Sequence, residues 1–348
     1  MNAIYLDHAA TTPVHPEVIE RMTEVLTTNF GNPSSIHSFG RKARQLLDQA
    51  RSICAQSIGA DDKEIIFTSG GTESDNLAIL GTAFANKHKG KHIVTTKIEH
   101  HATLYTIQHL EKNGYEVTYL DVGESGRIDP QDVQKHLRDD TILVSIMMVN
   151  NETGIIQPIK EIGEILKDHP AYFHTDAVQA FGLLPIDVKE LHVDLLSVSS
   201  HKINGPKGLG FLFARQDVSL QTLQFGGEQE RKRRAGTENV AGIAGFAKAI
   251  EIMQNTREDN IKLYQSFRSL FIDTLKENKI TFSINGRESE RVPNIINISF
   301  PNMNVETLLT NFDLNGVAAS SGSACTAGSV EPSHVLTAMY QADQPCTT

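Results

Sequence analysis

Short apolar runs alternate with amphipathic segments along the first two thirds of the chain. Seven runs rich in β-branched and aromatic residues predict strands at residues 64–68, 92–95, 116–120, 142–148, 172–176, 195–197 and 210–213. Between most of these runs, apolar residues recur every three or four positions and predict helices at residues 41–58, 73–84, 102–113 and 159–167. Because helices join parallel strands and cover their sheet, this alternation predicts an α/β fold with a mainly parallel, mixed sheet. Ligands of such sheets bind beyond the carboxyl ends of the strands.

The pattern changes after about Gly236. A long helical region reaches Asn278, and strand-like residues follow at 280–284 and 295–300. With 348 residues, of which 39% are hydrophobic, the chain is long enough to bury one large core and a second, smaller one. We predict a large domain at residues 14–250 and a smaller α+β domain formed by residues 1–13 and 251–348.

Composition narrows the classes of function. A net charge of −10 and a pI near 5.8 favour neither direct binding of nucleic acid nor attraction to an anionic membrane. No apolar stretch reaches the length of a membrane span, and the N-terminal residues lack the features of a signal peptide, so we expect a cytoplasmic protein. The three cysteines include no C-x-x-C pair, so we expect no disulfide framework and any important thiol to act singly.

Lys202 is the first candidate for chemistry. It lies between the hydroxyl-rich turn Ser199-Ser200-His201 and a Gly/Pro loop, and Asp176 and Gln179 follow an earlier predicted strand. A lysine amine can form a Schiff base with pyridoxal phosphate, and a buried carboxylate can keep the pyridine nitrogen of that cofactor protonated. Taken alone, one lysine and one aspartate are also compatible with ordinary surface residues.

A glycine-rich turn at residues 68–76 joins a predicted strand to a predicted helix. There, the backbone amide of Gly71 and the hydroxyl of Thr72 could bind a phosphate, and Ser199 and His201 could add further contacts beside Lys202. An ordinary N-capped turn is the alternative, because serine and threonine begin many helices.

Two further side chains follow predicted strands. His100 could stack on a pyridine ring and transfer protons, since imidazole is flat and titrates near neutral pH. A metal is the competing interpretation, but no cysteine or carboxylate lies at zinc-like spacing, and we expect no metal site. Asn151 could bond the phenolic oxygen of the cofactor or a substrate carboxylate; otherwise it is a loop asparagine that stabilises a turn.

Cys325 lies in a run of small residues at positions 319–329. A thiol in such a segment is expected to be exposed and free to move, as a nucleophile that travels between two places must be. An unremarkable loop thiol is the alternative. Cys54 falls within a helical pattern and is expected in the core, and no role is predicted for Cys346.

These motifs resemble those of the cysteine desulfurases, and of the group of nitrogen-fixation and housekeeping iron-sulfur enzymes among them. The resemblance runs from Met1 to about Met339. It rests on the segments at residues 6–13, 30–35, 68–76, 99–100, 149–152, 176–179, 199–202, 234–239 and 320–325.

The resemblance implies a pyridoxal phosphate enzyme of fold type I that converts L-cysteine to L-alanine and leaves a persulfide on its own cysteine. It implies that Lys202 forms the Schiff base, that Asp176 pairs with the pyridinium nitrogen, that His100 stacks on the ring and transfers protons, and that Cys325 takes the sulfur. It assigns the phenolic oxygen to Asn151 and Gln179, and the phosphate to Gly71, Thr72, Ser199, His201 and Thr237, the last from the partner subunit of a homodimer.

The resemblance leaves the sulfur acceptor open, either a scaffold for iron-sulfur clusters or a tRNA thiolation enzyme. It also implies an arginine that binds the substrate carboxylate in a segment beyond the matched motifs, whereas no arginine or lysine follows Arg291 here. We therefore expect weaker binding of the cysteine carboxylate. Three alternatives stay open: a selenocysteine lyase, another pyridoxal phosphate enzyme for a small amino acid, and a catalytically impaired member of the family.

Overall fold

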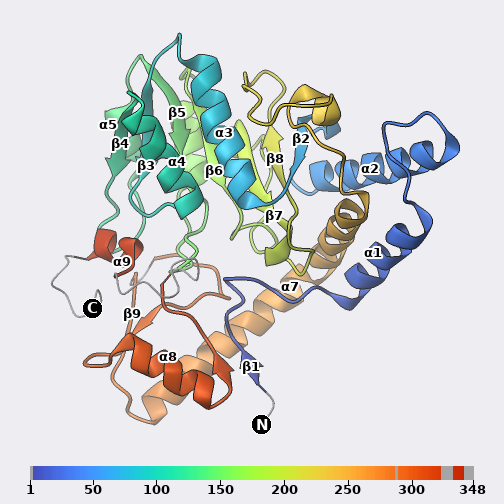
Figure 1. Cartoon of the computed structure of the whole chain (residues 1–348). Helices are drawn as coiled ribbons and strands as arrows, with labels where there is room; N and C mark the ends of the chain where they lie inside the picture. The colour runs from blue at the N-terminus through green and yellow to red at the C-terminus, as the bar shows by residue number, and fades with distance from the viewer. Residues whose placement is uncertain (1–2, 287–288, 323–331, 341–348) are drawn as a thin grey trace.

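The computed structural model describes residues 3–286, 289–322 and 332–340, and a seven-stranded sheet forms its centre (Figure 1). The strands are β2 (Ile65–Thr68), β3 (His92–Thr96), β4 (Glu116–Leu120), β5 (Thr141–Ser145), β6 (Tyr172–Asp176), β7 (Leu195–Ser199) and β8 (Gly210–Ala214). Their order is β2-β8-β7-β6-β5-β3-β4, and β8 alone runs antiparallel to its neighbours. All seven predicted strands are present, and the predicted α/β fold with a mainly parallel sheet is confirmed.

Continuous apolar runs produce these strands because both faces of the sheet are buried. On one face, α3 (Gly71–Asn86) and α4 (His101–Lys112) pack through a cluster that includes Ile79, Ile93 and Ile107. The other face packs against a larger cluster that includes Leu47 of α2 (Ser38–Gln56), Ile162 of α6 (Ile159–Leu166) and Phe246 of α7 (Val240–Glu277). The shorter α5 (Pro130–His136) contacts β4 and α6.

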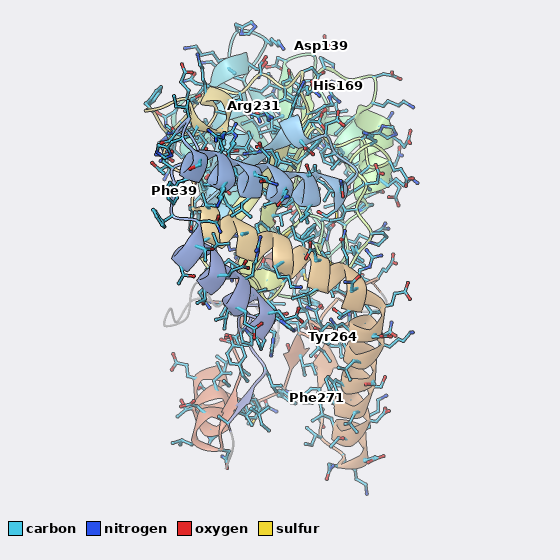
Figure 2. The ribbon with its side chains drawn as sticks, turned by 90° about the vertical axis from the view of Figure 1, so that its right-hand side faces the viewer. Phe39, Asp139, His169, Arg231, Tyr264 and Phe271 are labelled. Carbon is cyan, nitrogen blue, oxygen red and sulfur yellow. The ribbon has the colours of Figure 1, made fainter. Side chains whose placement is uncertain are left out.

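The long helix α7 links this sheet to the smaller elements at the bottom of Figure 1. Its buried residues end at Ile250, and Figure 2 shows Tyr264 and Phe271 on its second half, away from the sheet. The boundary between two domains, expected near residue 250, remains a prediction.

The remaining elements are short. They are β1 (Ile4–Tyr5), which pairs in parallel with β11 (Val317–Ala318), the antiparallel pair β9 (Ser283–Ile284) and β10 (Ile298–Ser299), and the helices α1 (Pro16–Thr28), α8 (Val305–Leu314) and α9 (His334–Met339). The predicted strands at 280–284 and 295–300 are therefore present but two residues long. Among the described residues, no helix is long and apolar enough to cross a bilayer.

Strands β2, β3, β5, β6 and β7 all run in one direction, so their carboxyl ends meet at one edge of the sheet. The candidate residues of the sequence follow these ends, because Asp176 closes β6 and Ser199 closes β7. The fold thus brings together residues that lie far apart in the sequence.

Candidate active site

Lys202 occupies a single 3-10 turn, η2 (Ser200–Lys202), directly after β7. Its Nζ donates hydrogen bonds to the carbonyl oxygens of Ala9 and Ala10, the latter at 2.9 Å. The Nε2 atom of Gln179 also donates to the Ala9 oxygen, at 2.9 Å. Two predicted site residues, which follow different strands, therefore bond the same short stretch of backbone.

That stretch belongs to the N-terminal segment, to which the sequence analysis gave no role beyond its likeness to a family motif. Thr12 Oγ1 donates to the His201 carbonyl at 2.7 Å and accepts from the Asn204 amide at 2.8 Å. Thr11 Oγ1 lies 3.1 Å from His201 Nδ1. These bonds fix the N-terminal segment against the lysine turn. The Thr-Thr pair after two alanines was the only signal in the sequence that could have indicated this.

Asp176 is a buried carboxyl at the end of β6. Its Oδ1 accepts a hydrogen bond from the Val178 amide at 2.8 Å. Burial raises the pKa of Asp176, while the charges of His100 and Lys202 and the Val178 amide oppose that rise. These positive groups favour the ionised form of Asp176, and a protonated ring nitrogen requires such a carboxylate beside it.

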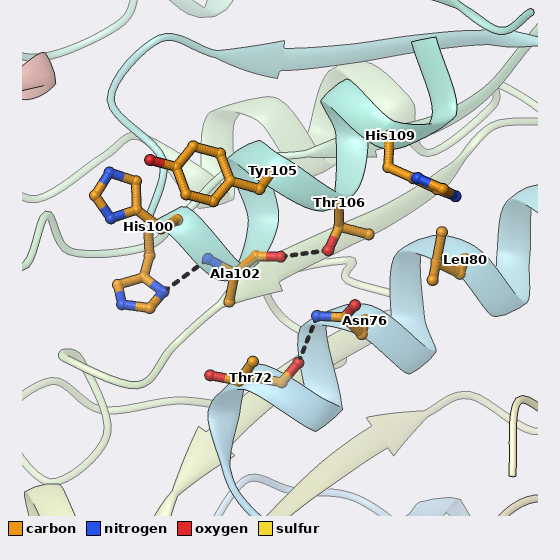
Figure 3. A pocket seen from close by; sticks show the side chains of 9 residues that line it. Thr72, Asn76, Leu80, His100, Ala102, Tyr105, Thr106 and His109 are labelled. Carbon is orange, nitrogen blue, oxygen red and sulfur yellow. Dashed lines mark hydrogen bonds between the residues drawn. The ribbon is translucent and has the colours of Figure 1, made fainter. Parts of the chain in front are cut away.

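His100 is the N-cap of α4, and its Nδ1 accepts from the Ala102 amide at 3.1 Å (Figure 3). This bond leaves Nε2 as the ring atom that can carry the proton of the neutral imidazole. Ring and carboxylate atoms of Asp75, His100 and Asp176 lie within 4.8 Å of one another. The site therefore contains a second aspartate that the sequence analysis did not single out.

Four of the five predicted phosphate contacts, all but Thr237, line one cavity of about 330 Å³. Its lining combines the turn before α3 with the end of β7 and the lysine turn: Thr11, Ser69, Gly70, Gly71, Thr72, Glu73, Ser199, His201, Lys207 and Gly208. The amides that begin α3 have no partners within the helix, so they can point at an anion, as can the ammonium group of Lys207. Lys207 was not predicted to bind phosphate.

Glycine is required at the start of this helix. Gly70 has a φ of 146°, a region that side chains rarely adopt, and a Cβ on Gly71 would lie 2.8 Å from Val178 Cγ2. The two glycines therefore let the backbone pass close to the loop after Asp176. A larger residue would push the helix start out of the cavity.

His201 is neutral at physiological pH. Burial lowers its pKa to about 4, and the charges of Lys202 and Lys207 act in the same direction. A neutral imidazole can still donate one hydrogen bond to a phosphate oxygen. Positive charge in the cavity therefore comes from Lys207 and the helix start rather than from His201.

A second cavity, of about 540 Å³, adjoins the first, because Thr72 lines both. Figure 3 shows His100, Tyr105 and His109 around it on the side of α4, with Asn76 and Leu80 opposite them on α3. Its position next to His100 provides room for a substrate beside the candidate cofactor site.

Comparison with known proteins agrees with this geometry. The family model for class-V aminotransferases matches residues 4–343. The chain is 61% identical over 340 residues to a candidate cysteine desulfurase, IscS 1, of Bacillus subtilis (strain 168), covering 98% of this chain and 90% of that protein. Two solved structures are similar: a NifS-like protein (TM-score 0.92, 35% identity, 99% of this chain and 92% of that one) and SspA in complex with cysteine (TM-score 0.83, 38% identity, 99% and 96%).

The chain belongs to the cysteine desulfurases of the class-V aminotransferase family. It is therefore an enzyme of the sulfurtransferase type, and its sheet has the arrangement of fold type I. Cysteine desulfurases depend on pyridoxal phosphate in general. The Bacillus subtilis relative is named as a cysteine desulfurase and not as a selenocysteine lyase.

Asn151 follows β5 and is partly exposed. Its Oδ1 atom is buried and has no hydrogen-bond partner in the described part of the chain. Its neighbour Glu152 is buried, and Ser333 at the start of α9 donates to the Glu152 carboxyl. The Asn151 amide thus has unfilled hydrogen-bonding capacity, as a group that contacts a ligand would have.

Two predicted residues are not brought to the desulfurase site by the described part of this chain. Thr237 is exposed just before α7 and does not line either cavity, although its neighbour Arg234 pairs with Glu73 of α3 at 2.7 Å. Cys325 and Cys346 lie outside the described residues, so the predicted nucleophile stays a prediction. Cys54 is buried in α2, as the helical pattern predicted.

Proposed function

We propose that this chain binds pyridoxal phosphate at the Lys202 site and converts L-cysteine to L-alanine, with transfer of the sulfur to Cys325 as a persulfide. The observation that carries the proposal is the convergence of Lys202, Asp176 and His100 at one sheet edge, beside a cavity suited to a phosphate. Membership of the cysteine desulfurases supports it, as does the similarity to SspA, whose structure holds cysteine.

The residues present fit the cofactor. Lys202 would hold its aldehyde carbon covalently, and Asp176 would pair with the ring nitrogen. The cavity of about 330 Å³ would hold the phosphate, through Gly71, Thr72, Ser199 and His201 of the predicted set and through Lys207. Amide groups of Gln179 and Asn151 would bond the phenolic oxygen, and Asn151 Oδ1, buried without a partner among the described residues, could accept its proton when that oxygen is a hydroxyl.

When bound, the cofactor would supply an electron sink that acidifies the Cα–H bond of the substrate. The chain would supply the rest. Asp176 would hold a proton on the ring nitrogen, and His100 would move protons, since one of its ring nitrogens lies within 4.8 Å of the Asp75 and Asp176 carboxylates. The Cys325 thiol would accept the sulfur: the C–S bond of cysteine breaks, an S–S bond forms at Cys325, and the thiol proton balances the new C–H bond of alanine.

The assembly and the sulfur acceptor belong to the same proposal. We infer a homodimer in which Thr237 of one subunit completes the phosphate site of the other, and a protein acceptor, either an iron-sulfur scaffold or a tRNA thiolation enzyme. The cytoplasmic location stays a prediction of the sequence.

The lysine assignment is tested by reducing the purified protein with borohydride and mapping the labelled peptide. We expect a yellow protein and a label on Lys202, and no label in Lys202→Ala. Lys207→Ala is the matched control, because Lys207 lines the same cavity but should carry no covalent link. A label on any other lysine would show the assignment to be wrong.

The sulfur step is tested by measuring alanine release and protein-bound persulfide with L-cysteine. Cys325→Ala should bind cysteine and shift the visible spectrum but form no persulfide, whereas Cys346→Ala should behave like wild type. The same assay with L-selenocysteine tests the alternative that the protein is a selenocysteine lyase. Equal alanine release from cysteine by wild type and Cys325→Ala would remove Cys325 from the mechanism.

A further inference from the structure

A second buried carboxyl has an oxygen within 4.8 Å of an Asp176 oxygen, and the proposed function gives it no role. Asp75, in the second turn of α3, is 1% exposed, and Asp176 at the end of β6 is 6% exposed. One carboxylate oxygen of each lies within 4.8 Å of the other and of a His100 ring nitrogen. The two acids thus share one desolvated space.

The hydrogen bonds of the two acids differ. Asp176 Oδ1 accepts from the Val178 amide at 2.8 Å, while Asp75 Oδ1 has no hydrogen-bond partner among the residues that the structure describes. His174 Nε2 lies 3.6 Å from Asp75 Oδ1. A carboxyl oxygen this deeply buried would gain from a proton and a neighbouring acceptor.

His174 does not supply a positive charge to Asp75. Its two ring nitrogens lie 2.8 Å from Ser145 Oγ and 3.1 Å from Ser197 Oγ, so hydroxyl groups bond the ring on both sides. Burial lowers the pKa of His174 to about 3, which keeps the ring neutral at physiological pH. The surroundings of Asp75 on the His174 side are therefore polar but uncharged.

Two carboxylates so close in a desolvated site cannot both ionise without a large cost. Burial, with the charge of Asp176, raises the pKa of Asp75 well above its usual value, although a hydrogen bond from the Ser197 hydroxyl opposes that rise. For Asp176, burial acts in the same direction, but His100, the Val178 amide and Lys202 oppose it. The proton of the pair is therefore better placed on Asp75.

We propose that Asp75 keeps a proton, donates it in a hydrogen bond to Asp176, and so holds the Asp176 carboxylate anionic and oriented for the cofactor's ring nitrogen. Asp75 is thus a positioning residue that acts through Asp176. This role rests on the proposed function, although the location of the proton does not. No bond to the substrate is involved.

Other titratable groups face the pair from the elements packed around it. Glu99 and His100 lie in the connection between β3 and α4, His174 lies on β6, and Lys202 lies in the turn after β7. Glu99 is itself a buried acid, and its pKa is raised by burial to about 8. Any measurement of the Asp75 proton must therefore remove the Glu99 proton first.

The proton is located by infrared difference spectroscopy in a Glu99→Gln background at neutral pH. Adding Asp75→Asn should remove the carbonyl stretch of a protonated carboxylic acid and leave the carboxylate bands in place. A difference that consists of carboxylate bands alone would overturn the proposal. The measurement uses the protein as purified and decides the proton's location whether or not the protein carries cofactor.

A cation is the other possible occupant of the cluster formed by Asp75, His100 and Asp176. Zn²⁺ added to chelator-treated protein should leave the protonated-acid band unchanged. Loss of that band with stoichiometric binding of Zn²⁺ would show that the cluster holds a metal ion instead, and would overturn the shared proton.

The positioning role is tested by the dissociation constant for pyridoxal phosphate and by the pH dependence of the bound cofactor's visible spectrum. Asp75→Asn retains a donor and should bind within about threefold of wild type. Asp75→Ala removes a hydrogen bond to a charged group and should weaken binding roughly ten- to a hundredfold, with a shift of the spectral transition. Circular dichroism checks that both variants are folded.

The outcomes separate the two proposals. If wild type and Asp75→Ala bind equally tightly with the same spectral transition, Asp75 has no positioning role, while the proposed function stands. If Asp75→Asn is as weak as Asp75→Ala, donation to Asp176 is wrong. If wild type binds no pyridoxal phosphate, the proposed function fails, and so does the role of Asp75 toward the cofactor, while the infrared result still decides the shared proton.

Discussion

At the scale of the residue, a single buried ion pair stabilises the least favourable stretch of backbone in the described chain. Glu230, Arg231 and Lys232 have φ values of 46°, 57° and 66°, a left-handed conformation that costs free energy for each residue other than glycine. The Glu230 carboxylate accepts two hydrogen bonds from the Arg51 guanidinium, at 2.7 and 2.8 Å, and one from the Phe67 amide at 3.0 Å. This network fixes the turn that leads to Thr237.

Glu230→Gln should reduce the free energy of unfolding by about 3–5 kcal/mol, because it leaves the Arg51 charge buried without its counterion. Urea denaturation measures this loss. The matched control is Glu24→Gln, which breaks the exposed pair with Arg21 and should cost less than about 1 kcal/mol. Equal losses in the two variants would contradict the role of burial.

Glu99 makes the stability depend on pH. It is fully buried, and it accepts hydrogen bonds from Thr96 Oγ1 at 2.7 Å and from the Met147 amide at 3.0 and 3.1 Å. Burial raises the pKa of Glu99 to about 8, above the value of 4.5 of the free side chain. The folded protein therefore binds a proton that the unfolded chain has lost.

Relative to Glu99→Gln, the free energy of unfolding of wild type should fall as the pH rises from 4.5 to about 8, by up to about 1.4 kcal/mol per pH unit, and then level off. Urea midpoints at several pH values measure the difference. Glu17 is the control, because its hydrogen bond to Lys248 lowers the pKa of Glu17. The contribution of Glu17 should instead be lost as the pH falls. A flat difference between wild type and Glu99→Gln would contradict a proton on Glu99.

Single residues also show what a sequence can predict. Lys202 and Asp176 were predictable because each follows a strand, and parallel strands end at one edge of the sheet. Asp75 was not predictable, because its role depends on the packing of α3 over Asp176, which excludes water from both carboxyls. The contacts of Ala9 with Lys202 were not predictable either, since backbone carbonyls carry no residue-specific signal.

At the scale of the element, the sheet was easier to predict than the small helices. Strands buried on both faces are continuous apolar runs, so a pattern reveals them. The strand predicted at 142–148 ends at Ser145, yet Met148 still donates to the Asp176 carbonyl at 2.8 Å. By contrast, α9 spans six residues, too few for a periodic pattern, and its position depends on contacts with distant parts of the chain.

Ser333 and His334 each contribute one of those distant contacts of α9. Ser333 Oγ caps the helix by accepting from the amides of Val335 and Leu336, at 3.1 and 3.2 Å, and also donates to Glu152. The next residue, His334, bonds the Glu99 carbonyl at 2.9 Å through Nε2, and its ring centroid lies 4.6 Å from that of His101. The start of α9 is thereby held against the loops that contain His100 and Asn151.

Ser333→Ala should increase amide exchange within α9 by roughly two- to thirtyfold, the range that corresponds to losing a helix cap. Hydrogen-exchange mass spectrometry measures this change, and peptides around Glu152 should exchange faster as well, because that carboxyl loses its donor. Asn304→Ala, which removes the cap of α8, should affect α8 alone. If exchange around Glu152 is unchanged in Ser333→Ala, the bond between them does not hold the loop.

At the scale of the whole molecule, exposed apolar side chains gather next to the turn that leads to Thr237. Phe30, Ile36 and Phe39 are 72%, 91% and 50% exposed, and the rings of Phe30 and Phe39 stack at 5.3 Å. Ser34, from the same loop, lines a cavity together with Arg231, and Figure 2 shows Phe39 and Arg231 on one side of the molecule. Such a surface is typical of an interface, which supports the proposed homodimer.

The dimer predicts that a mixed pair of variants restores one site. Thr237→Ala alone should bind pyridoxal phosphate roughly tenfold more weakly, as expected for one lost hydrogen bond to a charged group, and Lys202→Ala alone should form no covalent link. In a heterodimer of the two, the subunit that keeps Lys202 would receive an intact Thr237 from its partner. Half of the sites should therefore bind with wild-type affinity, measured by absorbance titration of tagged heterodimers. Heterodimers whose affinity stays that of Thr237→Ala would mean that Thr237 serves its own chain, and a monomer with full affinity in sedimentation would exclude the shared site.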